Sequence, residues 1–300
     1  MRQYRLLVHL LILILLSCGG NPKEEKATVE GKPVEVKKEP VNLNVSLLLD
    51  LSDRVDTVKY HNETMEFYLR DVGYIESISN AFINHLSLKK KRIIDDKIAL
   101  FFNPEPKNQR INRISEDLKF HINRGNATTE LFDNVKSVYS NKPKEIYEQT
   151  LEDNKYVGSD VWSFFKNKVK DFCIEEKSRN ILIILTDGYL FHIDNIRDQE
   201  NLSTYLTPQS IKKNQLNQAD WEQKFNDKNY GFIPATTELN DLEVLVLGIN
   251  PAKGNVYEDD IIKAYWENWF DKMEVGHYEL RNADLPSDMD KIIREFILKD

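Results

Sequence analysis

Short apolar runs alternate with amphipathic segments along most of the chain. Nearly continuous apolar runs are typical of strands buried on both faces of a parallel sheet, whereas apolar residues spaced three and four apart indicate helices. The sequence predicts strands at Leu43–Leu51, Lys97–Asn103, Asn180–Leu185, Leu242–Gly248 and His277–Leu280. It predicts helices at Tyr74–Leu88, Glu130–Tyr139, Lys144–Leu151, Val161–Lys177, Glu258–Met273 and Met289–Leu298.

One segment has a different pattern. In Asp117–Asn123, the apolar residues Leu118, Phe120 and Ile122 alternate with polar ones, which predicts a half-exposed strand at the edge of a sheet. Buried strands that alternate with amphipathic helices imply a mostly parallel sheet covered on both faces, and right-handed crossovers make this a three-layer, doubly wound α/β domain. Ligands bind such domains beyond the carboxyl ends of the strands, so the residues that follow the strands are the ones to examine for function.

The composition fits a globular domain and excludes several classes of protein. The 300 residues are 41% hydrophobic and 30% charged, which excludes wholesale disorder and a polytopic membrane protein. The net charge of −8, without a basic face, makes nucleic acid an unexpected partner. The two cysteines, Cys18 and Cys173, are too few for a disulfide scaffold or a four-thiolate zinc site. Cys173 lies in an apolar helical pattern, which predicts a buried small side chain without a redox role.

The first 17 residues have the pattern of a secretory signal peptide. Arg2 and Arg5 precede the apolar run Leu6–Leu16, whose eleven residues span only about 16 Å as a helix, too short for a ~30 Å hydrocarbon core. The run leads into the sequence Leu-Leu-Ser-Cys that ends at Cys18. This sequence resembles the lipobox of bacterial lipoproteins, in which the cysteine becomes the lipidated first residue of the mature chain. The alternative is an ordinary cleavable signal with a chance cysteine.

Residues 18–41 are rich in charge and proline, which predicts a lipidated cysteine followed by an extended, solvated tether. Several acyl chains hold a protein stably at a bilayer, so lipoprotein-type acylation of Cys18 would keep residues 42–300 at a membrane surface. The charged sequence Lys-Glu-Glu at 23–25 is similar to the surface-export signals of some lipoproteins. The resemblance implies a lipid-anchored, extracytoplasmic protein of the bacterial cell envelope, on the outer membrane or the cell surface.

Polar residues gather at three places, two of which are strand ends that the predicted fold brings to one edge of the sheet. The sequence Asp-Leu-Ser-Asp-Arg at 50–54 ends the first strand, Thr-Asp-Gly at 186–188 ends a later one, and Gly-Ser-Asp at 158–160 precedes a helix. Together with the order of elements over residues 41–300, these motifs resemble the von Willebrand factor A-type (integrin I-like) domain. The resemblance implies an antiparallel edge strand in third place. It also implies a metal-ion-dependent adhesion site made by an Asp-x-Ser-x-Ser loop, a Thr from a second loop and the Asp of a Thr-Asp-Gly-like loop.

Carried over residue by residue, the resemblance implies that Asp50, Ser52, Ser159 and Asp187 hold Mg²⁺ or Mn²⁺. Mg²⁺ is a hard ion that prefers six oxygens in near-octahedral geometry, and these residues offer carboxylate and hydroxyl oxygens. In the family, one coordination position stays open for an acidic residue of the partner. The metal then acts in binding rather than in catalysis.

The sequence departs from the family pattern at two positions. Ser159 stands where the family usually has Thr, which keeps the oxygen and loses only a methyl group. Arg54 stands where the second Ser should be, and a guanidinium repels a cation instead of ligating it. Arg54 is therefore a candidate modulator of the metal site: it either swings outward to solvent or Asp53, or pairs with Asp50 or Asp187 and replaces the ion.

Each site residue also has a structural interpretation. Asp50 could cap a turn, Ser52 could bond within its loop, and Thr-Asp-Gly at 186–188 is a common turn sequence. His192 and Asp194, which follow that turn, either line the site or belong to an ordinary polar loop.

A long polar stretch, Asp194–Asp241, leaves the sheet beside the predicted site, and Ile211–Asn226 within it has helical character. It is longer than most loops in compact domains. This insertion either contacts the ligand or forms a packed lid that only buries its own apolar residues. Trp266 and Trp269, in a later helix, are predicted to pack in the core.

The favoured function is that of a membrane-anchored binding or adhesion module that recognises a protein or glycan. The first alternative is a metal-dependent phosphoesterase of doubly wound fold. An aspartyl-phosphate mechanism, however, requires a second Asp at the position that Ser52 occupies. A Gly-rich phosphate loop, a Gly-x-Ser-x-Gly elbow and a His-Glu-x-x-His motif are all missing from the sequence, so an enzyme is not expected. The second alternative is a scaffold domain whose site is degenerate and metal-free because of Arg54.

Overall fold

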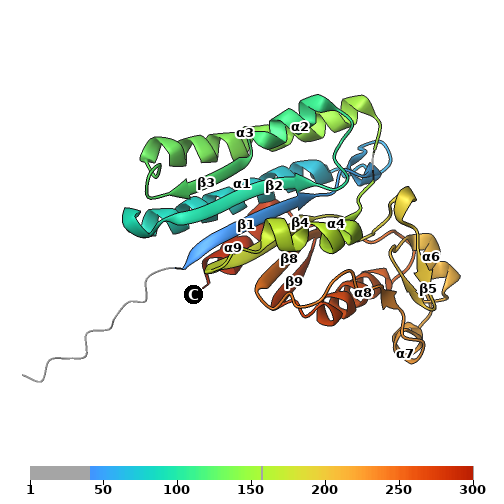
Figure 1. Ribbon diagram of the computed structural model, residues 1–300. Coiled ribbons are helices and arrows are strands. Elements are labelled where there is room, and N and C mark those ends of the chain that lie inside the picture. Colours follow the sequence, from blue (N-terminus) through green and yellow to red (C-terminus); the bar gives the residue numbers. More distant parts are fainter. Residues whose placement is uncertain (1–40, 157, 300) are drawn as a thin grey trace, which may run out of the picture. The chain divides into compact units, whose positions relative to one another are not determined.

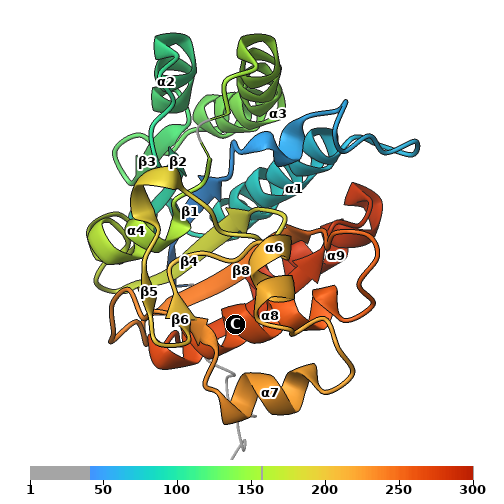
Figure 2. The same ribbon diagram turned by 90° about the vertical axis from the view of Figure 1, so that its right-hand side faces the viewer.

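The computed structural model describes residues 41–299 except residue 157, and the structural statements below concern this part of the chain. The signal peptide, Cys18 and nearly all of the tether predicted from the sequence lie outside the described residues. Figure 1 shows the fold from the side, and Figure 2 shows it with the loops at the carboxyl ends of the central strands toward the viewer.

A six-stranded sheet forms the centre of the fold, in the order β3-β2-β1-β4-β8-β9 (Figure 1). All neighbouring pairs are parallel except β2 and β3, which are antiparallel. The strands are β1 (Asn42–Leu49), β2 (Asp95–Phe102), β3 (Lys119–Asn123), β4 (Ser178–Leu185), β8 (Leu242–Ile249) and β9 (His277–Asn282). The prediction of a three-layer, mostly parallel sheet with one antiparallel edge strand is confirmed.

Helices cover both faces of the sheet because the side chains of each central strand point alternately to two apolar clusters. Leu47 of β1 and Ile183 of β4 contact the cluster formed with α1, α2, α3 and α9, whereas Leu48 and Ile184 contact the cluster formed with α4, α5 and α8. The helices are α1 (Phe67–Leu88), α2 (Gln109–Glu116), α3 (Thr129–Asp153), α4 (Val161–Asn167), α5 (Val169–Cys173), α8 (Glu258–Lys272) and α9 (Pro286–Leu298). Trp266 and Trp269 are fully buried, as predicted.

Two helix predictions were wrong in detail. The two helices predicted on either side of residue 143 are one helix, α3, with Pro143 inside it. Tyr139 and Tyr147, on either side of the proline, are fully buried, and this packing outweighs the helix-breaking tendency of Pro143.

The single helix predicted at Val161–Lys177 is divided into α4 and α5 at Lys168, whose backbone leaves the helical region. In α5, Val169 and Cys173 are buried in the core, whereas Phe172 is half-exposed. The prediction that Cys173 is buried is confirmed.

The insertion between β4 and β8 has a small sheet of its own (Figure 2). Its elements are β5 (Asp198–Gln199), β6 (Leu202–Ser203), α6 (Pro208–Lys213), α7 (Trp221–Asp227) and β7 (Gly231–Phe232). The helix predicted over Ile211–Asn226 is therefore two separate helices. Leu206, Ile211 and Phe232 of the insertion pack into the same cluster as Trp266. The insertion is thus built onto the core of the domain.

Among residues 41–299, none of the helices combines the length and the apolar character that crossing a bilayer requires.

The packing of the central strands gives a stability prediction. Ile183 is fully buried in β4, so Ile183→Ala removes packed atoms and leaves a cavity. We expect a loss of about 2–5 kcal/mol in the free energy of unfolding, measured by urea denaturation. The matched control is Leu88→Ala at the exposed end of α1, which should change it by about 0.5 kcal/mol or less. Equal losses in the two variants would contradict the described core.

Candidate functional site

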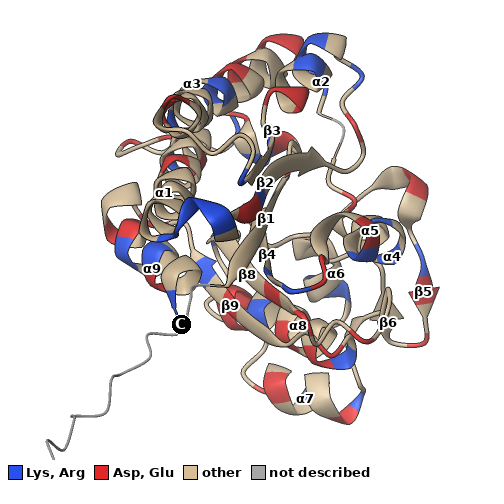
Figure 3. Ribbon diagram, turned by 60° about the vertical axis from the view of Figure 1, so that its left-hand side comes forward, with Lys and Arg blue, Asp and Glu red and all other residues tan. Residues whose placement is uncertain are grey.

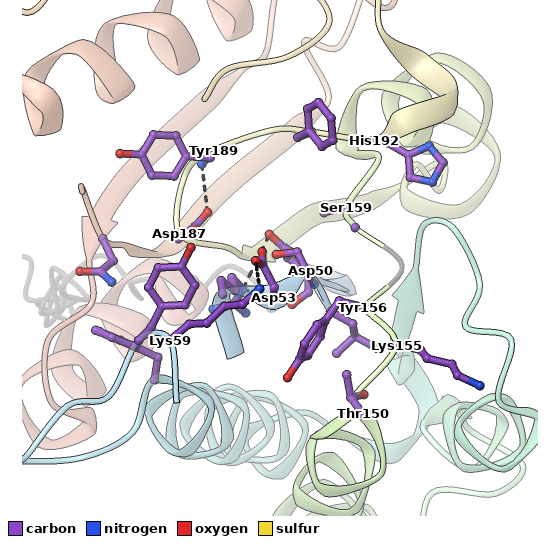
Figure 4. Close-up of a pocket in the computed structure, with 18 of the residues that line it drawn as sticks. Asp50, Asp53, Lys59, Thr150, Lys155, Tyr156, Ser159, Asp187, Tyr189 and His192 are labelled. Atoms are coloured by element: carbon purple, nitrogen blue, oxygen red, sulfur yellow. Dashed lines mark hydrogen bonds and ion pairs between the residues drawn. The ribbon is translucent and has the colours of Figure 1, made fainter. Parts of the chain in front are cut away.

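The loops at the carboxyl ends of β1, β4 and β8 surround a cleft of about 1450 Å³ (Figure 4). Asp50, Ser52, Ser159 and Asp187, which the sequence placed on three separate loops, all line this cleft. The other walls come from the end of β2, the end of α3 and the insertion. The structure therefore brings the four predicted residues to one edge of the sheet.

Asp50 joins the ends of two neighbouring strands. Its Oδ1 accepts a hydrogen bond from the backbone N–H of Ser52 at 2.8 Å, and its Oδ2 accepts one from the hydroxyl of Thr186 at 2.8 Å. The backbone N–H of Asp50 also donates to the carbonyl of Leu185 at 3.0 Å. The carboxylate is almost completely buried, so its position is fixed by the strands rather than by a mobile loop.

Asp187 lies two residues beyond the end of β4, on a turn that requires glycine at the next position. Gly188 has a φ of +94°, and a Cβ there would lie 2.6 Å from Cγ2 of Ile262. The turn lets the backbone N–H of Tyr189 donate to Oδ1 of Asp187 at 3.1 Å. Burial, together with the nearby Asp50 carboxylate, raises the pKa of Asp187 to about 7.

Ser159 comes from a third segment, which is fixed on two sides. Its backbone pairs with that of Phe191 in an antiparallel bridge, and Asp160 begins α4 by accepting a hydrogen bond from the N–H of Ser163 at 3.0 Å. The N–H of Asp160 donates to the carbonyl of Asn103 at 2.8 Å. These contacts hold Ser159 at the wall of the cleft, nearly buried.

Arg54 is buried behind the Asp50 loop. It pairs with Asp50, which is part of the second course expected from the sequence, but its shorter ionic contact is with Asp71. Its Nη2 donates to Oδ2 of Asp71 on α1 at 2.5 Å and to the carbonyl of Leu185 at 3.0 Å, while its Nε donates to the carbonyl of Asp50 at 3.1 Å. Its Nε also lies 3.7 Å from Oδ2 of Asp50. Burial disfavours the charge and is the largest single effect, but Asp71, Tyr147, Asp50 and Asp187 together outweigh it, so the pKa of Arg54 is raised.

Asp71 is the functional neighbour that sequence reasoning missed. The hydroxyl of Tyr147 on α3 also donates to its Oδ2, at 2.8 Å. The helix was predicted to begin at Tyr74, whereas α1 begins at Phe67 and includes Asp71. Asp71 lies three, four and seven residues before the buried Tyr74, Ile75 and Ile78, so a carboxylate on the apolar stripe was the available signal.

A second network that was not predicted fixes the wall of the cleft after β8. The Tyr189 hydroxyl donates to Oε1 of the buried Glu258 at 2.7 Å and accepts from the N–H of Ala252 at 2.9 Å. Asn255 donates to the other oxygen of Glu258 at 2.6 Å. Asp187 and the β8–α8 loop are thereby positioned by one tyrosine.

His192 and Asp194 both line the cleft, so the first of their two interpretations agrees with the structure. The backbone N–H of Asp194 donates to Nδ1 of His192 at 3.3 Å, and the same nitrogen lies 3.9 Å from Oδ2 of Asp160.

The donor set fits a hard divalent cation. Ser52 and Ser159 face the cleft with Asp187, and Asp50 keeps acceptor capacity beyond its two hydrogen bonds, because an ionised carboxylate has about four lone-pair positions. Within residues 41–299, no group of three or more His, Cys, Asp or Glu side chains is placed so that it could hold a metal ion. A cation site in this cleft therefore depends on hydroxyl oxygens as well as on carboxylates. Arg54 also lines the cleft, and its guanidinium is bound by Asp71 and two backbone carbonyls.

Comparison with known proteins gave distant structural matches. Neither the protein-family models nor the curated proteins gave a match. Among solved structures, the pilus adhesin SpaC from Lactobacillus rhamnosus GG matches with 10% identity and a TM-score of 0.39, over 87% of this chain and 31% of the adhesin. This chain therefore spans about a third of that adhesin's length.

Two further structures match over a similar part of this chain. An aerotolerance-related membrane protein from Bacteroides fragilis has 11% identity and a TM-score of 0.38, over 86% of this chain and 100% of that one. Proximal thread matrix protein 1 from the mussel byssus has 7% identity and a TM-score of 0.35, over 86% and 46%. The description of the fold therefore depends on the strand order and connections of this chain, and not on these distant matches.

The buried pair of Arg54 and Asp71 gives a second prediction. Arg54→Met leaves the Asp71 carboxylate buried without its cation, and we expect a loss of about 3–5 kcal/mol in the free energy of unfolding. The double variant Arg54→Met with Asp71→Asn should lose less than the sum of the two single variants, because they remove the same ion pair. Strictly additive losses in urea denaturation would show that the pair does not couple the two elements.

The raised pKa of Asp187 gives a prediction for pH dependence. Between its unfolded value near 4 and its folded value of about 7, the folded protein retains a proton that the unfolded chain has lost. The contribution of Asp187 to stability is therefore full at low pH and is lost as the pH rises to about 7. With EDTA present, the free energy of unfolding should fall over this range relative to that of Asp187→Asn. Parallel pH profiles would contradict the raised pKa.

Proposed function

We propose that this chain is a membrane-anchored, extracytoplasmic binding module that recognises a protein or glycan partner in the cleft at the carboxyl edge of the sheet. The observation that supports this proposal is the position of Asp50, Ser52, Ser159 and Asp187, which three distant segments bring to one cleft. The cleft is large enough for several side chains or sugar units, and its floor is rigid because strand ends form it.

The proposal includes a cation at this floor. Asp187, Ser52 and Ser159 would hold Mg²⁺ or Mn²⁺, with Asp50 contributing through its remaining acceptor positions. A bound ion there supplies an open coordination position for an acidic group of the partner. The protein's own part is to keep the four oxygen donors apart and oriented, which the Thr186–Asp50 and Tyr189–Asp187 hydrogen bonds do.

The location is part of the same proposal. The lipobox-like sequence that ends at Cys18 supports a triacylated anchor, and the tether that follows supports a domain held outside the cytoplasm at a bacterial membrane. Partner binding would then take place at the cell envelope.

A second candidate function is a scaffold domain that works without metal. The buried guanidinium of Arg54 favours it, because Arg54 places a permanent positive charge 3.7 Å from Asp50, where it offsets part of the charge that would attract a cation. The phosphoesterase alternative has no comparable support. An aspartyl-phosphate mechanism requires a carboxylate at position 52. The residue there is Ser52, which is half-buried at the start of a short 3₁₀ turn.

Isothermal titration calorimetry with Mg²⁺ and Mn²⁺ separates the two candidates. We expect wild-type protein to bind Mn²⁺, and Asp187→Asn to weaken binding by about tenfold or more, since it removes a charged ligand. The matched control is Asp194→Asn, which changes an exposed carboxylate of the same cleft and should leave the affinity within about twofold. Wild-type protein that gives no binding heat with either ion would contradict the cation site and favour the metal-free scaffold.

A further inference from the structure

The longest run of basic residues in the chain lies at one corner of the domain, between α1 and β2. It consists of Lys89, Lys90, Lys91 and Arg92, and residues 77–94 contain no Asp or Glu. In Figure 3, which brings the amino ends of the strands forward, this run is a blue segment that follows α1. The net charge of −8 therefore conceals a local cluster of cations, a pattern typical of segments that contact anionic surfaces.

Lys89 fixes this corner to the amino ends of β1 and β2. Its buried Nζ donates to Oδ2 of Asp96 at 2.6 Å and to Oδ1 of Asn42 at 2.6 Å. The other carboxylate oxygen of Asp96 accepts a hydrogen bond from the backbone N–H of Leu43 at 2.7 Å. Lys89 is thus used inside the fold, and it holds the residues on either side of it in place at the amino edge of the sheet.

The residues on either side of Lys89 form an exposed surface. Leu88 and residues 90–92 are all exposed, and these four residues are called the basic corner below. Leu88 is 78% exposed, although it is a large aliphatic residue. The next surface carboxylate along the chain, that of Asp95, lies 2.6 Å from Nε2 of His121. The basic corner therefore presents three cations beside one aliphatic side chain.

The basic corner lies next to the point where the rest of the chain joins the domain. Val41 is the first described residue, and its neighbour Asn42 is the one that Lys89 binds. Residues 18–40 connect this point to the proposed lipid anchor at Cys18, and a chain of that length spans at most about 80 Å. An anchored chain would therefore keep the basic corner within reach of the bilayer, where a high effective concentration makes even a weak contact count.

The features of the basic corner favour an anionic lipid surface over a soluble polyanion. Its three cations attract either partner, because physiological salt screens acidic groups that lie more than about 8 Å away. A nucleic acid or an acidic glycan would leave Leu88 in water, however, whereas the boundary between headgroups and acyl chains buries an aliphatic side chain. The position beside the tether also favours a surface to which the tether leads.

We propose that the basic corner is a second membrane contact, in which residues 90–92 bind anionic lipid headgroups and Leu88 inserts among them. This inference rests on the membrane anchoring that is part of the proposed function, and it adds an orientation to it. The cleft lies at the carboxyl ends of the same strands (Figure 1), and a strand of eight residues such as β1 is about 26 Å long. Contact at the basic corner directs the cleft away from the bilayer.

The test measures how residues 18–300 sediment with vesicles, with Cys18→Ser so that an acyl chain does not contribute. We expect binding to phosphatidylcholine vesicles that contain about 30% phosphatidylglycerol, and at least about tenfold weaker binding to phosphatidylcholine alone. In the variant Lys90→Gln/Lys91→Gln/Arg92→Gln, the affinity for the anionic vesicles should fall at least about tenfold. In Leu88→Ser it should fall about threefold or more, because an inserted apolar side chain is lost.

The matched control is Lys212→Gln/Lys213→Gln/Lys228→Gln, which removes three exposed cations from the ends of α6 and α7. It changes the net charge by the same amount as the basic-corner variant, but should change the affinity by less than about twofold because the contact is local. Circular dichroism melting establishes that each variant is folded.

Wild-type protein that binds both kinds of vesicle equally, or neither, would overturn the inference, and so would equal losses in the basic-corner variant and its control. Leu88→Ser that binds the anionic vesicles as tightly as wild type would indicate a site for a soluble polyanion and would also overturn it. Mass spectrometry of the full chain expressed in bacteria tests the anchor separately. An unmodified Cys18 contradicts the proposed location alone, whereas an acylated Cys18 without vesicle binding at the basic corner contradicts this inference alone.

Discussion

The ion pair between Arg54 and Asp71, with the hydrogen bond from Thr186 to Asp50 beside it, is the interaction on which the site depends. Three carboxylates lie close together in a buried region, where unpaired charge is costly: Asp50 and Asp187 follow buried strands, and Asp71 lies on α1. Arg54 offsets part of that charge from behind, through Asp71 and two backbone carbonyls. Asp187 lies on the cleft side of this cluster, where its carboxyl group can contact a ligand.

The fold explains why the remaining acidity faces the cleft. In a parallel sheet, the residues after β1, β4 and β8 meet at one edge, and helices that cover both faces leave only that edge open. The insertion after β4 extends this edge with a packed wall, and Tyr189 ties the β8–α8 loop to the same wall. A rigid polar floor and a packed wall result from one topological arrangement.

Much of this could be predicted from the sequence, for identifiable reasons. The strands β1, β4 and β8 are nearly continuous apolar runs, so their positions and the placing of Asp50 and Asp187 at one sheet edge followed from periodicity. Ser159, which precedes a helix, was assigned to the site only through the family resemblance. Features that depend on tertiary packing were missed: the continuity of α3 through Pro143, and the insertion strands of only two residues each. The role of Asp71 was missed because the start of α1 carries no side-chain cap that marks it in the sequence.

The most direct test of the cation-supported cleft is a crystal structure of residues 41–300 grown with Mn²⁺, with data collected at an energy where manganese scatters anomalously. The account predicts one anomalous peak within coordination distance of the oxygens of Ser52, Ser159 and Asp187, with Arg54 still bound to Asp71. A cleft that shows only water at saturating Mn²⁺, or a guanidinium turned into the place of the ion, would contradict it.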